Sequence, residues 1–368
     1  MTDQKVNVDQ GVSMSNEIKA KEYQRRQLEL GLLQEISTVL FLMVWVWISP
    51  WVAGLFNFGG YKLLIIFCLL SYVSYQALFF VLDYLSDYRL EHEYELSTEN
   101  FRQWLWRHGK VILLGGVLLG VLVVLLYTAV WYVKYWYIWC WLAWVLLSVI
   151  FAQVFPVLIL PIFYKSKRLE HVTLLDRFRK MAEGTGLSVE GIYKLELSSS
   201  TKKGNAMLAG LGRTRRVMLG DTLLEKLTED EISVVYAHEL GHHVFRHFWK
   251  ILFLHSVGSI VLFGLIYAVL NPVAWEAREL IVRLPLLALV MTLFTFFWRP
   301  VLYGFSRWFE NECDRYALEK TQSPKDFVSA FEKLADQNLA DRNPPRWVVW
   351  LFHDHPAIGE RIEAAKRF

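Results

Sequence analysis

Cysteines and charged residues are scarce in this chain of 368 residues, and each shortage excludes a class of protein. Only three cysteines occur (Cys68, Cys140 and Cys313), so a scaffold held together by disulfides is excluded. Charged residues make up 20% and hydrophobic residues 54%, so most of the chain carries too much apolar surface to stay disordered. The net charge of +3 is too small to indicate a nucleic-acid partner. Residues 1–30 lack the short apolar core and the cleavage site of a signal peptide.

Long apolar runs are what the sequence has in abundance. A membrane-spanning helix needs about 20 mainly apolar residues. Such runs predict six spans, near residues 33–53, 61–82, 111–133, 137–159, 251–270 and 284–303. Gly59-Gly60 and Asn271-Pro272 are turn signals that separate neighbouring helices. We therefore expect an integral membrane protein rather than a large soluble core of buried helices.

The placement of Lys and Arg predicts how the spans are oriented. With six spans, the loops on the far side are 54–60, 134–136 and 271–283. These loops and their borders hold only four of the 39 Lys and Arg residues, namely Lys62, Lys134, Arg278 and Arg283. Positive residues concentrate on the cytoplasmic side of membrane proteins. We therefore expect both termini to be cytoplasmic, in a bacterial-type inner membrane, or in the endoplasmic reticulum if the host is eukaryotic.

The hydrophilic segments divide the chain into five parts. They are an N-terminal arm (1–30), four spans with a cytoplasmic loop at 84–110 (31–164), an insert (165–250), two spans (251–305) and a C-terminal segment (306–368). Within the insert, the pattern predicts a helix at 169–184 and strands at 191–197, 205–210 and 216–219. A capping box at residues 228–231 opens a further helix. The expected fold is an all-α integral membrane protein with a small α+β insert.

That last helix carries the main chemical signal, His238-Glu239-Leu240-Gly241-His242. Spacing of i, i+4 puts both imidazoles on one helical face. Two nitrogens placed in this way can bind one Zn²⁺, and Glu239 lies where it can polarise a water molecule. The alternative is a helix with two ordinary surface histidines.

A catalytic zinc needs a third protein ligand and an open position. The candidates follow the sixth span, in residues 306–314. Glu310 and Asp314 share a helix face, so Glu310 can bind the metal while Asp314 accepts a hydrogen bond from a ligand imidazole. From the chemistry alone, Glu312 competes with Glu310 as the third ligand. Cys313 is a soft alternative that its offset from Glu310 disfavours.

Together these motifs resemble the CAAX prenyl protease 1 family of integral-membrane zinc metalloproteases. The similarity covers most of the chain from about residue 18. The matching pieces are the motif at 238–242, Ser306-Arg307-x-x-Glu310-x-x-Cys313-Asp314, His355-Pro356 with Arg361-Ile362, Asn205-Ala206, and the acidic segment 88–97. The family typically has seven spans and an alanine in the place of Cys313, whereas this sequence predicts six spans, the missing one at the N terminus.

The resemblance implies roles for the matching residues at the metal. His238, His242 and Glu310 would hold one zinc ion per chain, and Asp314 would orient a ligand histidine. Glu239 would act as general base. His355 would stabilise the oxyanion, since a histidine donor aimed at developing charge contributes several kcal/mol. Without the resemblance, His355 would be read as an ordinary histidine of the tail.

The resemblance also suggests how substrate is bound. Asn205 would bind the substrate backbone along an edge strand, by strand addition. Arg361 would bind the substrate carboxylate or hold the C-terminal segment, with a surface salt bridge as the alternative. His243 and His247 lie off the ligand face or too far along it, and we interpret them as supporting or merely polar. The spans are expected to surround a wide, water-filled chamber with the zinc at its cytoplasmic end.

The predicted function is a zinc endopeptidase that acts at the cytoplasmic membrane face on a peptide or membrane-protein substrate, with or without a prenyl group. One substrate hypothesis is removal of a C-terminal tripeptide from a prenylated cysteine. The other is quality control of membrane proteins, as in heat-shock-type membrane proteases. A zinc-stabilised scaffold is disfavoured because Glu239 is present. A transporter would need charged or broken helices at the midplane, and Arg299-Pro300 is the nearest candidate.

Overall fold

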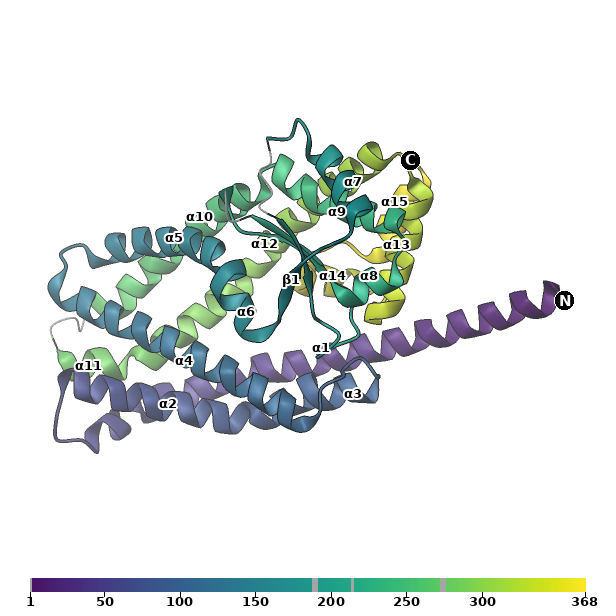
Figure 1. The fold of residues 1–368 in the computed structure, drawn as a ribbon. Helices are drawn as coiled ribbons and strands as arrows, with labels where there is room; N and C mark the ends of the chain where they lie inside the picture. The colour runs from purple at the N-terminus through teal and green to yellow at the C-terminus, as the bar shows by residue number, and fades with distance from the viewer. Residues whose placement is uncertain (1, 187–190, 213–214, 272–275) are drawn as a thin grey trace.

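The computed structural model describes residues 2–186, 191–212, 215–271 and 276–368. Within them, six helices are long and apolar enough to cross a membrane. They span Asn16–Gly54, Gly60–Glu93, Phe101–Tyr132, Trp136–Phe163, His247–Leu270 and Ala277–Thr321. They lie together at one end of the molecule (Figure 1), and the six predicted spans are confirmed. The turn predicted at Asn271-Pro272 reaches into residues outside the described part.

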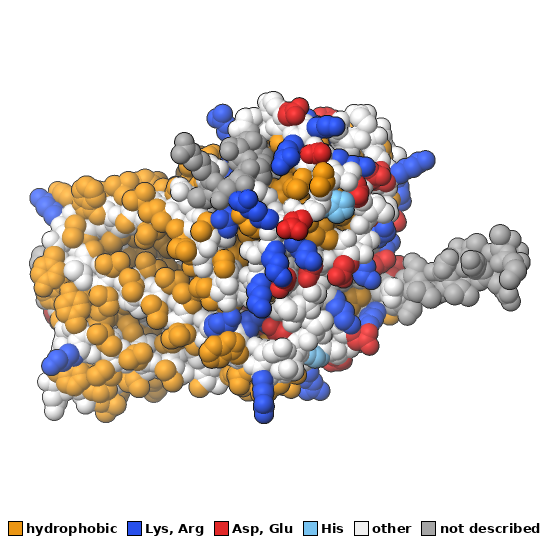
Figure 2. Space-filling view, in the orientation of Figure 1, with side chains coloured by type: hydrophobic (Ala, Val, Ile, Leu, Met, Phe, Trp, Pro, Cys, Tyr) orange, Lys and Arg blue, Asp and Glu red, His pale blue; other side chains and the backbone are white. Residues whose placement is uncertain are grey.

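Several of these helices extend well beyond the apolar runs that predicted them. The bounds are α1 (Thr2–Gly54), α2 (Gly60–Asp83), η1 (Tyr84–Leu90), α3 (Glu91–Glu93), α4 (Phe101–Tyr132), α5 (Trp136–Val154), η2 (Phe155–Ile159), α6 (Leu160–Phe163), α10 (His247–Leu270), α11 (Ala277–Val282) and α12 (Leu284–Thr321). The membrane end is covered with hydrophobic side chains, whereas Lys, Arg, Asp and Glu gather on the other end (Figure 2). This division of the surface is typical of a multi-pass membrane protein.

The charged residues near the spans have partners in the structure. Arg299, inside the predicted sixth span, forms an ion pair with Glu35 of α1 at 2.6 Å. On the opposite side, Arg278 donates hydrogen bonds to the carbonyl oxygens of Ala53 and Phe56. A cation in or near the bilayer is costly unless it is paired. Arg299 therefore links α12 to α1, and it is not the broken-helix site that a transporter would need.

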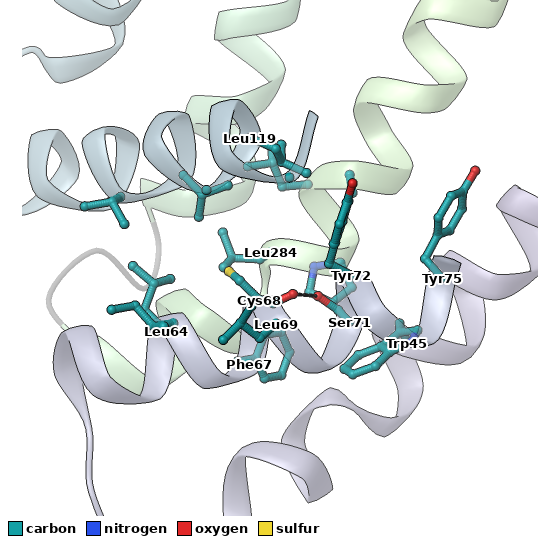
Figure 3. Close-up of a pocket in the computed structure, with 18 of the residues that line it drawn as sticks. Trp45, Leu64, Phe67, Cys68, Leu69, Ser71, Tyr72, Tyr75, Leu119 and Leu284 are labelled. Carbon is teal, nitrogen blue, oxygen red and sulfur yellow. Dashed lines mark hydrogen bonds between the residues drawn. The ribbon is translucent and has the colours of Figure 1, made fainter. Parts of the chain in front are cut away.

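A cavity of about 990 Å³ lies among α1, α2, α4 and α12. Its wall is largely apolar and includes Trp45, Phe67 and Leu119 (Figure 3). Two polar side chains of the wall form hydrogen bonds with the backbone: Ser71 Oγ donates to the carbonyl of Cys68, and the Tyr72 hydroxyl donates to the carbonyl of Ile112. The described lining is thus mostly an apolar surface, although we expected a wet inner face.

The insert contains a four-stranded sheet in the order β1-β2-β4-β3. The strands are β1 (Ser166–Arg168), β2 (Gly191–Leu195), β3 (Ala206–Ala209) and β4 (Arg216–Gly220), and the helices α7 (Val172–Ala182) and α8 (Asp221–Lys226) accompany them. β2 and β4 run parallel, and the other two pairs are antiparallel. Three strands lie where the sequence predicted them. β1 was missed because three polar residues show no alternating pattern.

The helix with the chemical motif, α9 (Glu229–Val244), lies at the centre of this half of the molecule. Its capping box is confirmed, because Thr228 accepts a hydrogen bond from Glu231 N and Glu231 accepts one from Thr228 N. Residues on every side of α9 are buried, so neighbouring elements surround it. Those neighbours include α12 and α13 (Pro324–Asn338). The last two helices, α14 (Arg346–Phe352) and α15 (Ile358–Lys366), pack against α12, and α15 also packs against α13.

Candidate metal centre

The structure brings His238, His242 and Glu310 together where α9 crosses α12. Their ligand atoms all lie within 4.8 Å of one another. His238 Nε2 is 3.1 Å from Glu310 Oε2, and His242 Nε2 is 3.2 Å from Glu310 Oε1. The competing carboxylate, Glu312, lies elsewhere and contacts His247 at 3.0 Å. Glu310 is therefore the third member of the group, as the resemblance implied.

One feature of the structure supports a zinc ion between these three side chains. Glu310 Oε2 is buried and makes no hydrogen bond among the described residues, although His238 Nε2 lies 3.1 Å away and Arg361 Nη2 3.5 Å away. A buried carboxylate oxygen without a partner is costly. A cation between the carboxylate and the two imidazoles satisfies it, and two histidines with one glutamate are a known catalytic zinc set.

Asp314 lies behind His238 on the side away from Glu310. Its Oδ1 is 2.9 Å from His238 Nδ1. Arg361 of α15 donates to the same carboxylate twice, at 2.7 Å from Nε and 2.6 Å from Nη2. Burial opposes a charge on His238, but the nearby carboxylates of Asp314 and Glu310 outweigh it and raise its pKa to about 9. Metal binding must displace such a proton, so acid weakens metal uptake.

Arg361 is not at the surface. It is 8% exposed, it lies over the ring of Phe331 at 4.2 Å, and its Nη2 is 3.5 Å from Glu310 Oε2. The alternative of a surface salt bridge is therefore wrong. The side chain is directed into the protein at Asp314, which favours holding the C-terminal segment over binding a substrate carboxylate. The sequence did not indicate this, because a single arginine in a short charged helix resembles any surface residue.

The tail after α14 carries His355 to the same centre. His355 Nε2 lies 3.4 Å from Glu310 Oε1, and its Nδ1 contacts Asp354 at 2.7 Å. Burial lowers the pKa of His355, but Asp354 and Glu310 outweigh it, so the pKa is raised. Arg307 of α12 fixes the tail by donating to the carbonyls of Val349 and His353 at 3.0 and 2.6 Å. His355 is 52% exposed, so it is open to a bound molecule.

Glu239 faces the free edge of the sheet. Its Oε2 accepts a hydrogen bond from Leu208 N of β3 at 3.2 Å. β3 is the outermost strand and pairs only with β4 within the sheet. Asn205 is exposed directly before β3, and its carbonyl accepts a hydrogen bond from Gly220 N. An edge of this kind presents backbone groups to which an extended peptide can pair.

Close helix contact at the centre requires a glycine in the motif. A Cβ built on Gly241 would lie 3.1 Å from both Cα and Sγ of Cys313, which is tighter than most side-chain contacts. The glycine therefore allows α9 to approach the backbone of α12. This approach sets the distance between the two histidines on one helix and Glu310 on the other.

His243 and His247 behave differently, which the sequence did not show. Burial and the charges of Arg215 and Arg246 lower the pKa of His243 to about 4, and its Nε2 lies 3.2 Å from Arg215. His247 is buried against His242, with 3.1 Å between their Nδ1 atoms. His242, His247 and Cys313 form a second group, whose possible ligand atoms lie within 4.8 Å of one another.

The fold and this site define a multi-pass membrane protein with a metallopeptidase-type centre at the end of its spans. Comparison with known families agrees. The pattern of "Peptidase family M48" matches residues 169–368, and that of "CAAX prenyl protease N-terminal, five membrane helices" matches residues 8–165. The chain belongs to peptidase family M48, and the resemblance is confirmed. In its described part, residues 8–165 hold four helices of membrane length, one fewer than that description names.

Relatives and a solved structure show the same likeness. An uncharacterized metalloprotease of Bacillus subtilis, YhfN, is 30% identical over 220 residues, which is 58% of this chain and 52% of that protein. The CAAX prenyl protease 1 of Saccharomyces cerevisiae is 25% identical over 233 residues, covering 57% of this chain and 51% of that protein. The matched region thus spans about half the length of these curated relatives. The crystal structure of S. mikatae Ste24p shares the fold, with a TM-score of 0.82 at 21% identity over 95% of this chain and 88% of that one.

Proposed function

We propose that the protein is an integral-membrane zinc metalloendopeptidase that hydrolyses peptide bonds at the cytoplasmic face of the membrane. The observation that carries the proposal is the approach of His238, His242 and Glu310 ligand atoms to within 4.8 Å, beside Glu239 and an open strand edge. The insert and the C-terminal segment would together form the catalytic unit. Most Lys and Arg side chains on the face shown lie at that end, which supports its cytoplasmic placement (Figure 2).

In this proposal His238, His242 and Glu310 hold one zinc ion. When bound, the zinc supplies Lewis-acid activation of water and of the scissile carbonyl. Asp314 fixes the ring of His238 by accepting from Nδ1, which leaves Nε2 for the metal. We assign Arg361 to the same task, because its guanidinium neutralises and orients Asp314.

The remaining groups act on the substrate. An extended peptide would pair with the free edge of β3, with Asn205 at the start of that edge. Glu239 would take a proton from the attacking water and later give it to the leaving amine. His355 would donate a hydrogen bond to the oxygen that becomes negative, which contributes several kcal/mol to the transition state. Its exposure and its place beside Glu310 support that role.

The chemistry of the substrate has two candidates. The relatives in yeast and plants are named CAAX prenyl proteases, which favours a prenylated C-terminal peptide. The Bacillus relative is named only as a metalloprotease. The alternative is quality control of membrane proteins, which needs no prenyl group. A lipid bilayer surrounds the spans in either case, and neither candidate involves nucleic acid.

A paired peptide assay tests the proposal. Purified full-length protein in detergent is given a fluorogenic farnesylated CaaX peptide and, separately, the same peptide without the lipid. Glu239→Gln and a chelator are the controls, and Glu239→Gln is expected to lower kcat by about 10²–10⁴-fold. Cleavage of the farnesylated peptide alone supports prenyl specificity, and equal cleavage of both supports quality control. Zinc-loaded protein that cleaves neither peptide would refute the proposal for both substrate classes.

A further inference from the structure

His247 is the first residue of α10, and it is 1% exposed. It sits against the metal centre because the chain turns sharply just before it. Arg246 adopts a left-handed backbone with φ of 57°, which ends α9 and starts α10 in a new direction. The side chain of His247 then points back at His242, with 3.1 Å between the two Nδ1 atoms.

With the proposed metal held by His242 and Glu310, one arrangement of protons satisfies the contacts of His247 with His242 and Glu312. His242 Nε2 faces Glu310 at 3.2 Å, and when the proposed metal binds there, the neutral imidazole carries its proton on Nδ1 and must donate it. The acceptor at 3.1 Å is His247 Nδ1. His247 must then carry its own proton on Nε2, where Glu312 Oε2 accepts it at 3.0 Å.

We infer that Glu312 and His247 form a hydrogen-bonded relay that orients His242 for metal binding. The inference rests on the proposed metal site. In it His242 receives, through a second imidazole, the support that His238 receives directly from Asp314. Partners of ligand histidines fix the tautomer and the ring orientation, and they typically contribute about 10–100-fold to metal affinity.

The surroundings of His247 hold its ring in the orientation that the relay needs. Phe309 stacks on it with ring centroids 4.3 Å apart and an interplanar angle of 19°. Cys313 Sγ lies 3.5 Å from its Nδ1, so the thiol adds a second weak donor to the same acceptor. Lys250 Nζ lies 3.6 Å from Glu312 Oε2 and balances the carboxylate charge. The alternative role for His247 is packing alone, since its ring already fills space beside Phe309.

Zinc affinity, measured by competition with a chromophoric chelator, separates orientation from packing. The full-length chain is compared with His247→Phe, which keeps an aromatic ring but cannot accept a hydrogen bond. We expect the zinc Kd to rise about 10–100-fold in His247→Phe. Glu312→Gln should raise the Kd less, and the double variant should be no weaker than His247→Phe, because both act along one path. His247→Gln, whose amide can accept from His242 and donate to Glu312, should recover part of the affinity.

His243→Phe is the matched control, because it changes the neighbouring histidine, which contacts Arg215 rather than a ligand. Its zinc Kd should stay within about twofold of the parent. Wild-type affinity in both His247→Phe and Glu312→Gln would overturn the relay and leave packing as the role of His247. Should His247→Phe fail to fold, Glu312→Gln decides alone.

All Kd values are measured in the Glu239→Gln background as well, so they do not depend on proteolysis. A parent that binds zinc but cleaves no peptide would refute the proposed function, while the Kd differences still decide the relay. A parent that binds no zinc would overturn both.

Discussion

Replacing Arg361 should destabilise the protein far more than replacing Arg367, which directly follows the same helix. The guanidinium is 8% exposed and makes two hydrogen bonds to Asp314, at 2.7 and 2.6 Å. Arg361→Met leaves the Asp314 carboxylate buried with its charge uncompensated. Removing one partner of a buried ion pair costs about 3–5 kcal/mol. At about 2 °C per kcal/mol for a large chain, Tm should fall by about 6–10 °C.

The matched control is Arg367→Met directly after the same helix, because Arg367 is exposed. It should change the free energy of unfolding by no more than about 0.5 kcal/mol. Arg361→Lys should fall between the two, since lysine keeps the charge but not the planar pair of donors. Thermal unfolding is measured on the full-length chain in one detergent at a fixed zinc concentration, because bound metal itself raises Tm.

The competing role for Arg361, binding a substrate carboxylate, makes the opposite prediction. Arg361→Met would then raise KM for a peptide with a free C terminus and leave Tm unchanged. A Tm within about 2 °C of wild type, together with a raised KM, would refute the buried-pair reasoning and return Arg361 to the substrate site. Since the Arg361–Asp314 pair holds α15 in place beside His238, we also expect weaker zinc binding in Arg361→Met.

Three further predictions concern the same half of the molecule. Gly241→Ala should destabilise the fold by about 1–3 kcal/mol and weaken zinc binding, because the new Cβ meets Cys313 Sγ and Cα at 3.1 Å. Adding Cys313→Ala should recover part of the lost Tm and part of the lost zinc affinity. For Asp221 and Glu231, burial raises the pKa, but hydrogen bonds from Ser198 to Asp221 and from Lys333 and Ser329 to Glu231 outweigh it and hold both values below the usual range. Their stabilisation is complete only above about pH 5, beyond the pKa values of the unfolded chain, and it is lost as pH falls through the lowered values. Asp221→Asn and Glu231→Gln should therefore flatten the loss of Tm between pH 6 and 3, and an unchanged slope in both would contradict this. A chelator should abolish cleavage and lower Tm. Glu239→Gln should lose cleavage but keep the rise of Tm with zinc. A Tm that does not change with zinc concentration would count against a zinc site in the folded state.

The membrane half of the fold could be predicted from the sequence because its signal is local. Each span is a run of apolar residues long enough to cross the bilayer, and no contact between distant segments is needed to see it. The capping box before α9 and the i, i+4 histidines are local in the same sense. Glu310 was harder, because chemistry alone left Glu312 as a competitor. The resemblance favoured Glu310, and the crossing of α9 and α12 then placed it between the two histidines.

What the sequence could not show depends on non-local contacts and on single backbone angles. Arg361 meets Asp314 across 47 positions of sequence, and nothing in α15 indicates which of its charges is buried. For His247 the sequence left a supporting role and a merely polar one open, because five residues along a continuous helix is about 140° from His242. The left-handed conformation of Arg246 breaks that helix, and a non-glycine residue gives no sequence signal for it. The three-residue strand β1 is too short to carry a pattern.

One helix connects the metal centre to the membrane. α12 runs without interruption from Leu284 to Thr321 and carries cavity-lining residues such as Met291 near one end and Glu310 toward the other. At a rise of 1.5 Å per residue, Glu310 lies about 10 Å beyond residue 303, where the apolar run ends. α10 continues from α9 after a single turn at Arg246, so His238 and His242 are tied to a second span over an equally short distance. The depth of the site relative to the bilayer is therefore fixed by two stiff connections rather than by flexible linkers. Because the site lies so close to the ends of two spans, we expect peptides anchored in the bilayer to be cleaved faster than the same peptides free in solution.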